Sequence, residues 1–296
     1  MRDFVGYGFE QPSFCWPNGS RLAVSVVVNF EEGAEQQVGY GDPRSESIGE
    51  VISVVPPGTR DIGQEQIFAY GMRAGLPRML RALEERAIPA TFFMCGRAVR
   101  NVPDLARRVV ARGHEPAVHG WTWRPHSDYA TREDEARDLD ACIAVIVTAT
   151  GRRPVGFFCR GSESVHTRSL LVERGMLYTS NAFDDDIPYR DPEHPGLVIL
   201  PYALDTNDMK FFHPNGFVRP SEMIEYVAEA LATVLAEAES GHTRLLNIGY
   251  HLRIVGRPAR FQAFTGVLDR LRDLGDRIWI ATRQDIAEAW RRADGP

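Results

Sequence analysis

The stretch LAVSVVVNFEEGAE, residues 22–35, decides the fold. Its first nine residues are almost all apolar and rich in β-branched side chains, which is typical of a strand buried on both faces of a parallel sheet. Two adjacent carboxylates, Glu31 and Glu32, follow the strand directly, and Gly33 comes next. Paired acids at the end of a buried strand indicate either a solvated strand end or a functional site.

Strand-like and helix-like segments alternate along the rest of the chain, which favours an α/β fold with a closed or nearly closed (β/α) barrel. A doubly wound open sheet is the alternative, and the missing GxGxxG motif argues against a Rossmann fold. Strands are predicted at 22–30, 90–95, 115–121, 155–161, 177–182, 197–203, 244–251 and 277–282, and helices at 75–87, 102–113, 132–151, 221–241 and 259–275.

The length of 296 residues fits two ordinary domains or one large barrel, and the repeated strand–helix units favour a single domain over 1–296. Residues 34–64 differ from the rest because they carry Gly, Pro, Ser and charges without sustained periodicity. We interpret them as a long insertion after the first strand. Such loops in compact domains form lids, site walls or oligomer contacts.

Composition narrows the class of protein. The formal net charge is −6 and the hydrophobic content is 44%, which is typical of a globular protein with a sizeable core. The absence of a Lys/Arg cluster argues against nucleic acid and membrane surfaces as partners, and no apolar run is long enough to span a bilayer. The four scattered cysteines and the absence of a signal peptide predict a cytoplasmic protein with free thiols.

Polar residues follow most of the predicted strands, at the ends where barrels of this kind place their active sites. Each of them alone has a structural explanation, such as a core histidine or a turn, but their convergence on one face favours an enzyme. The residues are Glu31, Glu32, His119, Trp121, Trp123, Arg160, Asp184, Asp185, Asp186, Asp205, Asn207 and His251.

These residue types suit hydrolysis of an amide-like C–N bond. That reaction needs a base for water, a group that stabilises the oxyanion and an acid for the departing nitrogen. A carboxylate can serve as the base, and a histidine oriented by a carboxylate can serve as the acid. No GxSxG elbow is present, which disfavours covalent acyl catalysis.

Several motifs in combination resemble the polysaccharide deacetylase (NodB-homology) superfamily, and most of all its allantoinase-like and cyclic-imide-hydrolase-like branch. They are VGYG at 5–8, WPNG at 16–19, NFEEG at 29–33, HGW at 119–121, DDIPY at 185–189 and YHLRIVGRPARFQAF at 250–264. The resemblance covers nearly the whole chain. It implies a (β/α)7-type distorted TIM-like barrel and hydrolysis of non-peptide C–N bonds.

The resemblance also implies roles for individual residues. Glu31 stands where the superfamily has its catalytic base, and Arg160 resembles the arginine that supports the base. His251 resembles the late histidine that acts as general acid, with Asp185 or Asp186 near the acid that orients it. Trp121 and Trp123 would wall a pocket and stack on a planar ring, and Glu32 and Asp186 would help to bind substrate.

The motifs depart from the superfamily at the metal site. Glu32 and His119 match metal ligands, but Trp123 stands where a second histidine is expected, and an indole cannot ligate. His126 completes a site only if its loop folds back. A divalent site needs about three protein ligands plus water. We therefore expect either no required cofactor or a weakly held divalent ion such as zinc.

Three functions follow from these patterns. The first is a hydrolase that opens a small cyclic amide, imide or ureide, such as allantoin, with base-activated water. The second is a metal-dependent N-deacetylase of an acetylated sugar or peptidoglycan fragment, and the third is a catalytically degraded barrel that binds a small molecule. A homo-oligomer, with the tetramer as one form, is expected from the insertion and the resemblance.

Overall fold

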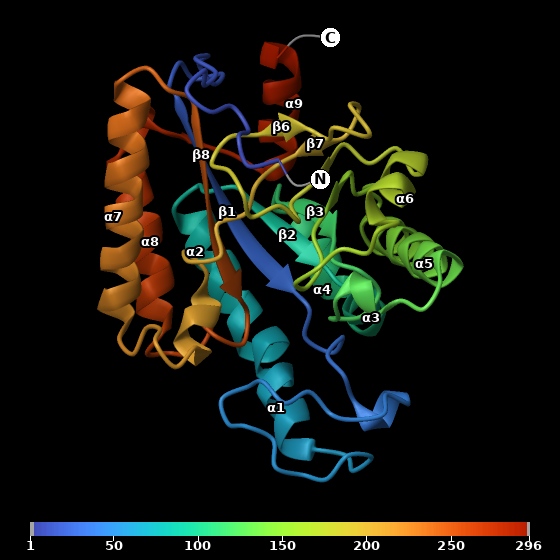
Figure 1. The fold of residues 1–296 in the computed structure, drawn as a ribbon. Coiled ribbons are helices and arrows are strands. Elements are labelled where there is room, and N and C mark those ends of the chain that lie inside the picture. Colours follow the sequence, from blue (N-terminus) through green and yellow to red (C-terminus); the bar gives the residue numbers. More distant parts are fainter. Residues whose placement is uncertain (1–2, 295–296) are drawn as a thin grey trace.

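One curled sheet organises the chain, and the computed structural model describes residues 3–294 (Figure 1). The strand order is β6-β7-β5-β4-β3-β2-β1-β8, and β9 also pairs with β1. Every strand pair is parallel except β6 with β7. The strands are β1 (Leu22–Phe30), β2 (Ala90–Met94), β3 (Glu115–Val118), β4 (Gly156–Phe157), β5 (Tyr178–Thr179), β6 (Tyr189–Arg190), β7 (Val198–Ile199), β8 (Arg244–His251) and β9 (Trp279–Ile280).

Helices cover the sheet, and α7 and α8 pack together on one flank while α3, α4 and α5 pack on the other (Figure 1). They are α1 (Ile62–Tyr70), α2 (Leu76–Glu85), α3 (Gly96–Asn101), α4 (Pro103–Val110), α5 (Arg132–Thr150), α6 (Thr167–Glu173), α7 (Pro220–Glu239), α8 (Phe261–Asp273) and α9 (Arg283–Asp294). A π-helical turn, Gly71–Gly75, joins α1 to α2. Among residues 3–294, no helix combines the length and apolar character needed to cross a membrane.

The sheet curls into a half-barrel, which confirms the predicted α/β fold of the distorted (β/α) barrel type. Its two ends approach each other through the segment that follows β7. Asn207 forms a parallel bridge with Gly249 of β8, and the Ala203 N–H donates to Asn247 Oδ1 at 2.6 Å. The segment 203–207 thus partly fills the gap that the short strands leave.

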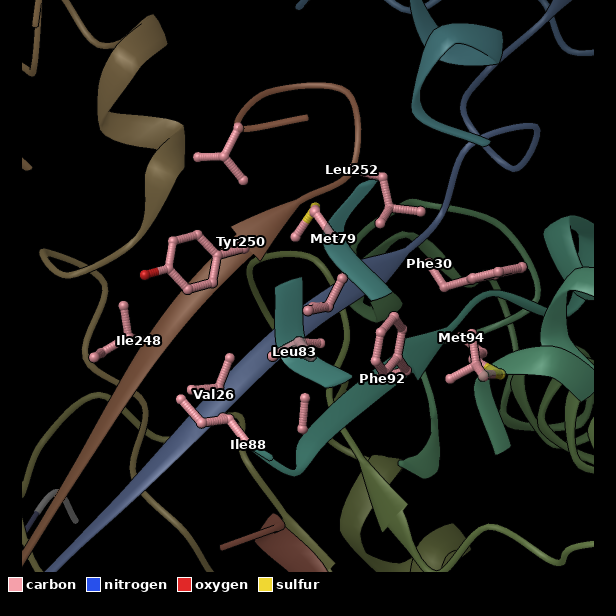
Figure 2. Packing of buried hydrophobic residues seen from close by; sticks show 14 of the residues in the cluster. Val26, Phe30, Met79, Leu83, Ile88, Phe92, Met94, Ile248, Tyr250 and Leu252 are labelled. Atoms are coloured by element: carbon pink, nitrogen blue, oxygen red, sulfur yellow. The ribbon is translucent and has the colours of Figure 1, made fainter. Parts of the chain in front are cut away.

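The core explains why β1 is so apolar. All nine of its residues are buried, because strands flank it and helices cover it. Figure 2 shows Met79 and Leu83 of α2 packed toward Val26 of β1, Phe92 of β2 and Ile248 of β8. Burying such a side chain contributes roughly 1.5–3 kcal/mol to stability. This packing fixes the register in which β1 and β8 end side by side.

The insertion lies at the end of the molecule toward which β1 and β8 point (Figure 1). Between residues 34 and 61 the described chain forms only one short 3₁₀ turn, Val38–Tyr40, before α1 begins. Asp61 caps α1 by accepting a hydrogen bond from the Gln64 N–H at 3.0 Å. The insertion therefore borders the carboxyl ends of the central strands, where the polar residues gather.

Candidate active site

Glu31 is the centre of the polar cluster. It follows β1 directly, and its side chain has no exposed surface. Three basic side chains face it: Arg253 Nη1 lies 2.5 Å from Oε1, His119 Nε2 lies 3.3 Å from Oε2, and His251 Nε2 lies 3.7 Å from Oε1. The Glu31 carboxylate, at the end of β1, is thus enclosed by basic side chains from the ends of β3 and β8.

These neighbours decide the ionisation of Glu31. Burial alone would raise its pKa, but the charges of His251 and Arg253 and the nearby His119 hold the pKa well below its usual range. Glu31 is therefore a carboxylate at neutral pH.

His251 is held by a second carboxylate. Its Nδ1 donates to Asp208 Oδ1 at 2.6 Å, and its backbone N–H donates to Asp208 Oδ2 at 2.8 Å. Burial lowers the pKa of His251, but Glu31 and Asp208 outweigh it, so the net shift is upward. Asn29 lies opposite His251 in the register of β1 and β8, and its Nδ2 is 2.9 Å from Nε2. The ring is therefore fixed in orientation by Asp208 at Nδ1 and by Asn29 at Nε2.

His119 presents one ring nitrogen to Glu31. Its Nδ1 lies 2.6 Å from the carbonyl oxygen of Phe158, which can only accept a hydrogen bond, so Nδ1 carries the proton. The other ring nitrogen, Nε2, lies 3.3 Å from Glu31 Oε2. The segment after β3 thus supplies an imidazole nitrogen to the cluster.

Glu32 lies beside Glu31 and is equally buried. Its Oε1 accepts the Arg253 backbone N–H at 3.0 Å, and its Oε2 accepts the Glu31 N–H at 3.3 Å. Burial raises the pKa of Glu32 to about 7, with the Glu31 charge adding to the rise and Arg253 opposing it. Gly71 in the π-helical turn packs so closely that a Cβ there would lie 2.6 Å from Glu32 Oε1.

Arg253 is the arginine of this cluster. Its guanidinium carbon lies 4.3 Å from the ring centre of Phe68 and 4.8 Å from that of Trp123. The residue is fully buried, and its Nε and Nη2 atoms have no hydrogen-bond partner among the described residues. The Nε and Nη2 groups of Arg253 are therefore two unpartnered hydrogen-bond donors beside the Glu31 carboxylate.

Arg160 does not occupy the role expected from the sequence. Its Nη1 pairs with Glu46 Oε2 at 2.7 Å, and its guanidinium stacks over Trp123 at 3.7 Å. The group that contacts Glu31 is Arg253, which reaches the carboxylate because β8 ends beside β1. Trp123 is buried between the two arginines, so it contributes to the wall of the cluster.

Asp185 and Asp186 lie elsewhere. Asp185 accepts the N–H groups of Asp186 and Ile187, and the Asp186 carbonyl accepts the Leu245 N–H at the beginning of β8. His251 ends the same strand, six residues later, which corresponds to roughly 20 Å. The chain after β5 turns back along the sheet before β6, so these acids reach its opposite end, and Asp208 is the acid that orients His251.

Trp121 and His126 are also held apart from Glu31 by contacts of their own. Trp121 packs against Gly96 at the start of α3, with the Arg100 guanidinium 5.1 Å from its ring. His126 is buried, and its Nδ1 lies 2.9 Å from Glu135 Oε1 of α5.

A divalent ion would need Glu31, Glu32 and His119 as ligands. Within residues 3–294, however, no group of three or more His, Cys, Asp or Glu side chains has the arrangement of a metal site. The Arg253 guanidinium contacts Glu31 and lies 3.6 Å from Glu32 Oε1. A cation already stands against both carboxylates, so the residues present do not fit a metal ion.

Three residues of the cluster were not predicted from the sequence: Arg253, Asp208 and Asn29. Arg253 lies in the motif YHLRIVG, two residues after His251, and that spacing from a strand-ending histidine is the signal that could have found it. Asp208 follows Asp205 and Asn207, which were noted as polar residues after a strand. Asn29 is a polar residue inside the apolar run of β1, just before the paired acids. That position is the signal that could have placed it in the site.

Comparison with known proteins covers nearly the whole chain. A family model described as polysaccharide deacetylase matches residues 65–178. A crystal structure described as "probable Polysaccharide deacetylase from Pseudomonas aeruginosa PAO1" is 36% identical, with a TM-score of 0.91 over 98% of this chain and 98% of that chain. The crystal structure of "Puue Allantoinase" is 35% identical, with a TM-score of 0.91 over 98% of this chain and 96% of that chain.

A shorter similarity exists to the peptidoglycan deacetylase of Helicobacter pylori. It is 27% identical over 142 residues, which are 47% of this chain and 48% of that protein. The two solved structures named above, by contrast, each match 98% of this chain.

Proposed function

This chain belongs to the polysaccharide deacetylase family and is a hydrolase of carbon–nitrogen bonds, and we propose that it opens a small cyclic amide, imide or ureide with water activated by Glu31. The observation that carries this proposal is the set of contacts around Glu31. A buried carboxylate is held ionised by Arg253, and the His251–Asp208 pair lies against it.

The two central groups have opposite ionisation tendencies. The pKa of Glu31 is lowered and that of His251 is raised, so Glu31 is ionised at neutral pH and His251 keeps its proton to a higher pH than a free histidine does. Groups whose pKa values are pushed apart in this way suit base and acid roles in one reaction. Their separation of 3.7 Å means that they flank the same reacting centre.

The reaction then proceeds in three proton transfers to or from the side chains of the enzyme. Glu31 takes a proton from water as the water oxygen adds to the substrate carbonyl carbon. The C–N bond breaks as His251 gives its Nε2 proton to the leaving nitrogen. Glu31 returns its proton through solvent to His251, which restores the starting state of the enzyme. The new carboxylic acid releases its own proton to solvent, so the products are a carboxylate and a ring-opened amine or amide.

Arg253 suits the oxyanion of the tetrahedral intermediate. Its Nε and Nη2 groups are buried donors without a partner, and the guanidinium is held between Phe68 and Trp123. Fixed donors in a water-poor site stabilise developing negative charge more than water does. The same guanidinium therefore holds the base through Nη1 and faces the substrate with its other nitrogens.

Two features support a small substrate. Glu31 has 0% exposed surface and His251 has 4%, whereas a sugar polymer needs reacting groups that line an open groove. The 35% identity to a protein described as an allantoinase, over 98% of this chain, supports a cyclic ureide within that class.

A panel of substrates tests this proposal. The purified enzyme is incubated separately with allantoin, hydantoin, succinimide and an N-acetylated oligosaccharide, and ring opening or acetate release is followed. We expect turnover of at least one cyclic substrate and none of the sugar. Acetate release alone would favour the second candidate, N-deacetylation of an acetylated sugar, which the similarity to a peptidoglycan deacetylase supports. Binding without turnover would indicate a degraded, ligand-binding barrel.

A further inference from the structure

Two buried carboxyl groups lie side by side at the end of β1, and the ionised Glu31 requires a positive charge beside it. Glu31 and Glu32 have side chains with no exposed surface, and an uncompensated buried charge is strongly destabilising. The Nη1 atom of Arg253 lies 2.5 Å from Glu31 Oε1 and 3.6 Å from Glu32 Oε1. One nitrogen of one side chain thus faces both acids.

The atoms around this nitrogen are of the kinds that bind a divalent cation, although in the wild-type chain no three such side chains of residues 3–294 have the arrangement of a metal site. Carboxylate oxygens and an imidazole nitrogen are common ligands of zinc. Glu31 and Glu32 supply the oxygens, and His119 directs Nε2 toward Glu31 at 3.3 Å, with its Nδ1 proton held by the Phe158 carbonyl. A histidine whose other nitrogen donates to a carbonyl is oriented as metal-binding histidines usually are.

The guanidinium is held in place independently of the acids. The rings of Phe68 and Trp123 face its central carbon from 4.3 and 4.8 Å. A divalent ion at this position would meet a fixed positive charge within a few ångströms in a low-dielectric interior, which is strongly unfavourable.

We propose that Arg253 is the built-in cation of this site: its guanidinium takes the place of a divalent ion against Glu31 and Glu32, and removing it creates a metal site with Glu31, Glu32 and His119 as ligands. This inference deepens the proposed function, because it assigns the positive charge that holds the base to the chain itself. Its test measures metal binding and not turnover, so it can fail while the hydrolase activity stands.

The test compares wild type with Arg253→Ala. Each protein is treated with a chelator, desalted and titrated with Zn²⁺ by calorimetry and with Co²⁺ by visible absorption. We expect Arg253→Ala to bind about one equivalent of either ion with visible bands of low-symmetry Co²⁺, and to unfold at a higher temperature when Zn²⁺ is present. Wild type should show neither binding nor a thermal shift.

Two further variants identify the cause and the ligands. Arg253→Lys keeps the charge and should bind no metal, and adding His119→Ala to Arg253→Ala should abolish the binding. Arg160→Ala is the matched control, because this arginine also stacks on Trp123 but pairs with Glu46, and it should bind no metal.

Several outcomes would overturn the proposal. One is a Co²⁺ spectrum in wild type that disappears in His119→Ala, and another is metal binding by Arg253→Lys equal to that of Arg253→Ala. If Arg253→Ala is recovered only when Zn²⁺ is present during folding, the proposal is supported. If it fails to fold with and without the ion, the wild-type and Arg253→Lys titrations decide.

Discussion

Arg253 Nη1 lies 2.5 Å from Oε1 of Glu31, and neither side chain is exposed. This contact joins the end of β8 to the end of β1, which neighbour each other in the sheet. It places a permanent positive charge beside the candidate base without using solvent or a bound ion. His251 and Glu32 adjoin the same contact. His251 Nε2 lies 3.7 Å from this Oε1 of Glu31, and Glu32 Oε1 accepts the backbone N–H of Arg253.

The pH dependence of kcat/KM should have its alkaline limb set by His251. The pKa of His251 is raised above 6.5, so activity should fall as pH rises through that raised value. Asp208→Asn removes one of the charges that raise it, so the limb should move to lower pH. A pH–rate profile of both proteins measures the move. Asp205→Asn is the control, since Asp205 bonds to Tyr226 at the surface, and an equal move there would contradict the assignment.

Glu35 should make the fold less stable as pH rises. Burial raises its pKa from 4.5 to about 7, although hydrogen bonds from Gly33 and Gln37 oppose the rise. The folded state therefore keeps a proton that the unfolded state loses between these values, and stability falls by on the order of 3 kcal/mol across them. Glu35→Gln should flatten the free energy of unfolding measured by urea titration over this range. The control Glu133→Gln, at an exposed position, should keep the wild-type dependence of the free energy of unfolding on pH. The same dependence in Glu35→Gln would refute the prediction.

Gly71→Ala should lower activity although alanine is the better helix former. At an ordinary helical glycine this change stabilises by roughly 0.5–1 kcal/mol. Here the added Cβ would lie 2.6 Å from Glu32 Oε1 and would displace the anchor of the Arg253 backbone. We expect kcat/KM to fall roughly tenfold to 100-fold. Gly196→Ala is the control, because a Cβ there would have no neighbour within 4 Å. If Gly71→Ala and Gly196→Ala have equal activity, the close contact of Gly71 with Glu32 does not matter for catalysis.

The homo-oligomer expected from the sequence remains a prediction. The insertion, residues 34–64, has exposed apolar side chains that could form the contact between subunits. Ile52 and Val54 are 80% and 90% exposed there, which is unusual for large aliphatic side chains that lie close together. Light scattering after gel filtration should give an oligomer for wild type, and Ile52→Glu with Val54→Glu should shift it to smaller species. Val218→Glu changes an equally exposed side chain outside the insertion and should not. A monomeric wild type would contradict this prediction.

The strongest elements of the fold could be predicted because their residues are buried on both faces. β1 and β8 have the boundaries that the apolar runs at 22–30 and 244–251 indicate. The strand predicted at 155–161 is longer than the observed β4, because only Gly156 and Phe157 pair with residues of the neighbouring strands. β6 was not predicted, since two half-buried residues leave no periodic pattern. Helices α1, α3, α6 and α9 were missed as well.

The site could be predicted only in part. Glu31, His119 and His251 each end or follow a strand, so their convergence follows from parallel order alone. Asp208 and Arg253 lie in segments that leave the sheet, and their direction depends on how those segments pack. Asp185 carries the same strand-end signal as Glu31, but its segment turns back along the sheet, which no local pattern reveals.

The most direct measurement is turnover by chelator-treated enzyme, wild type against Glu31→Gln, on the cyclic substrate that the panel identifies. We expect wild type to keep its kcat after metal removal. Glu31→Gln should lose roughly 10²- to 10⁴-fold in kcat while binding the substrate with similar affinity. Activity that disappears with the chelator and returns only with zinc, or a Glu31→Gln enzyme with unchanged kcat, would contradict it.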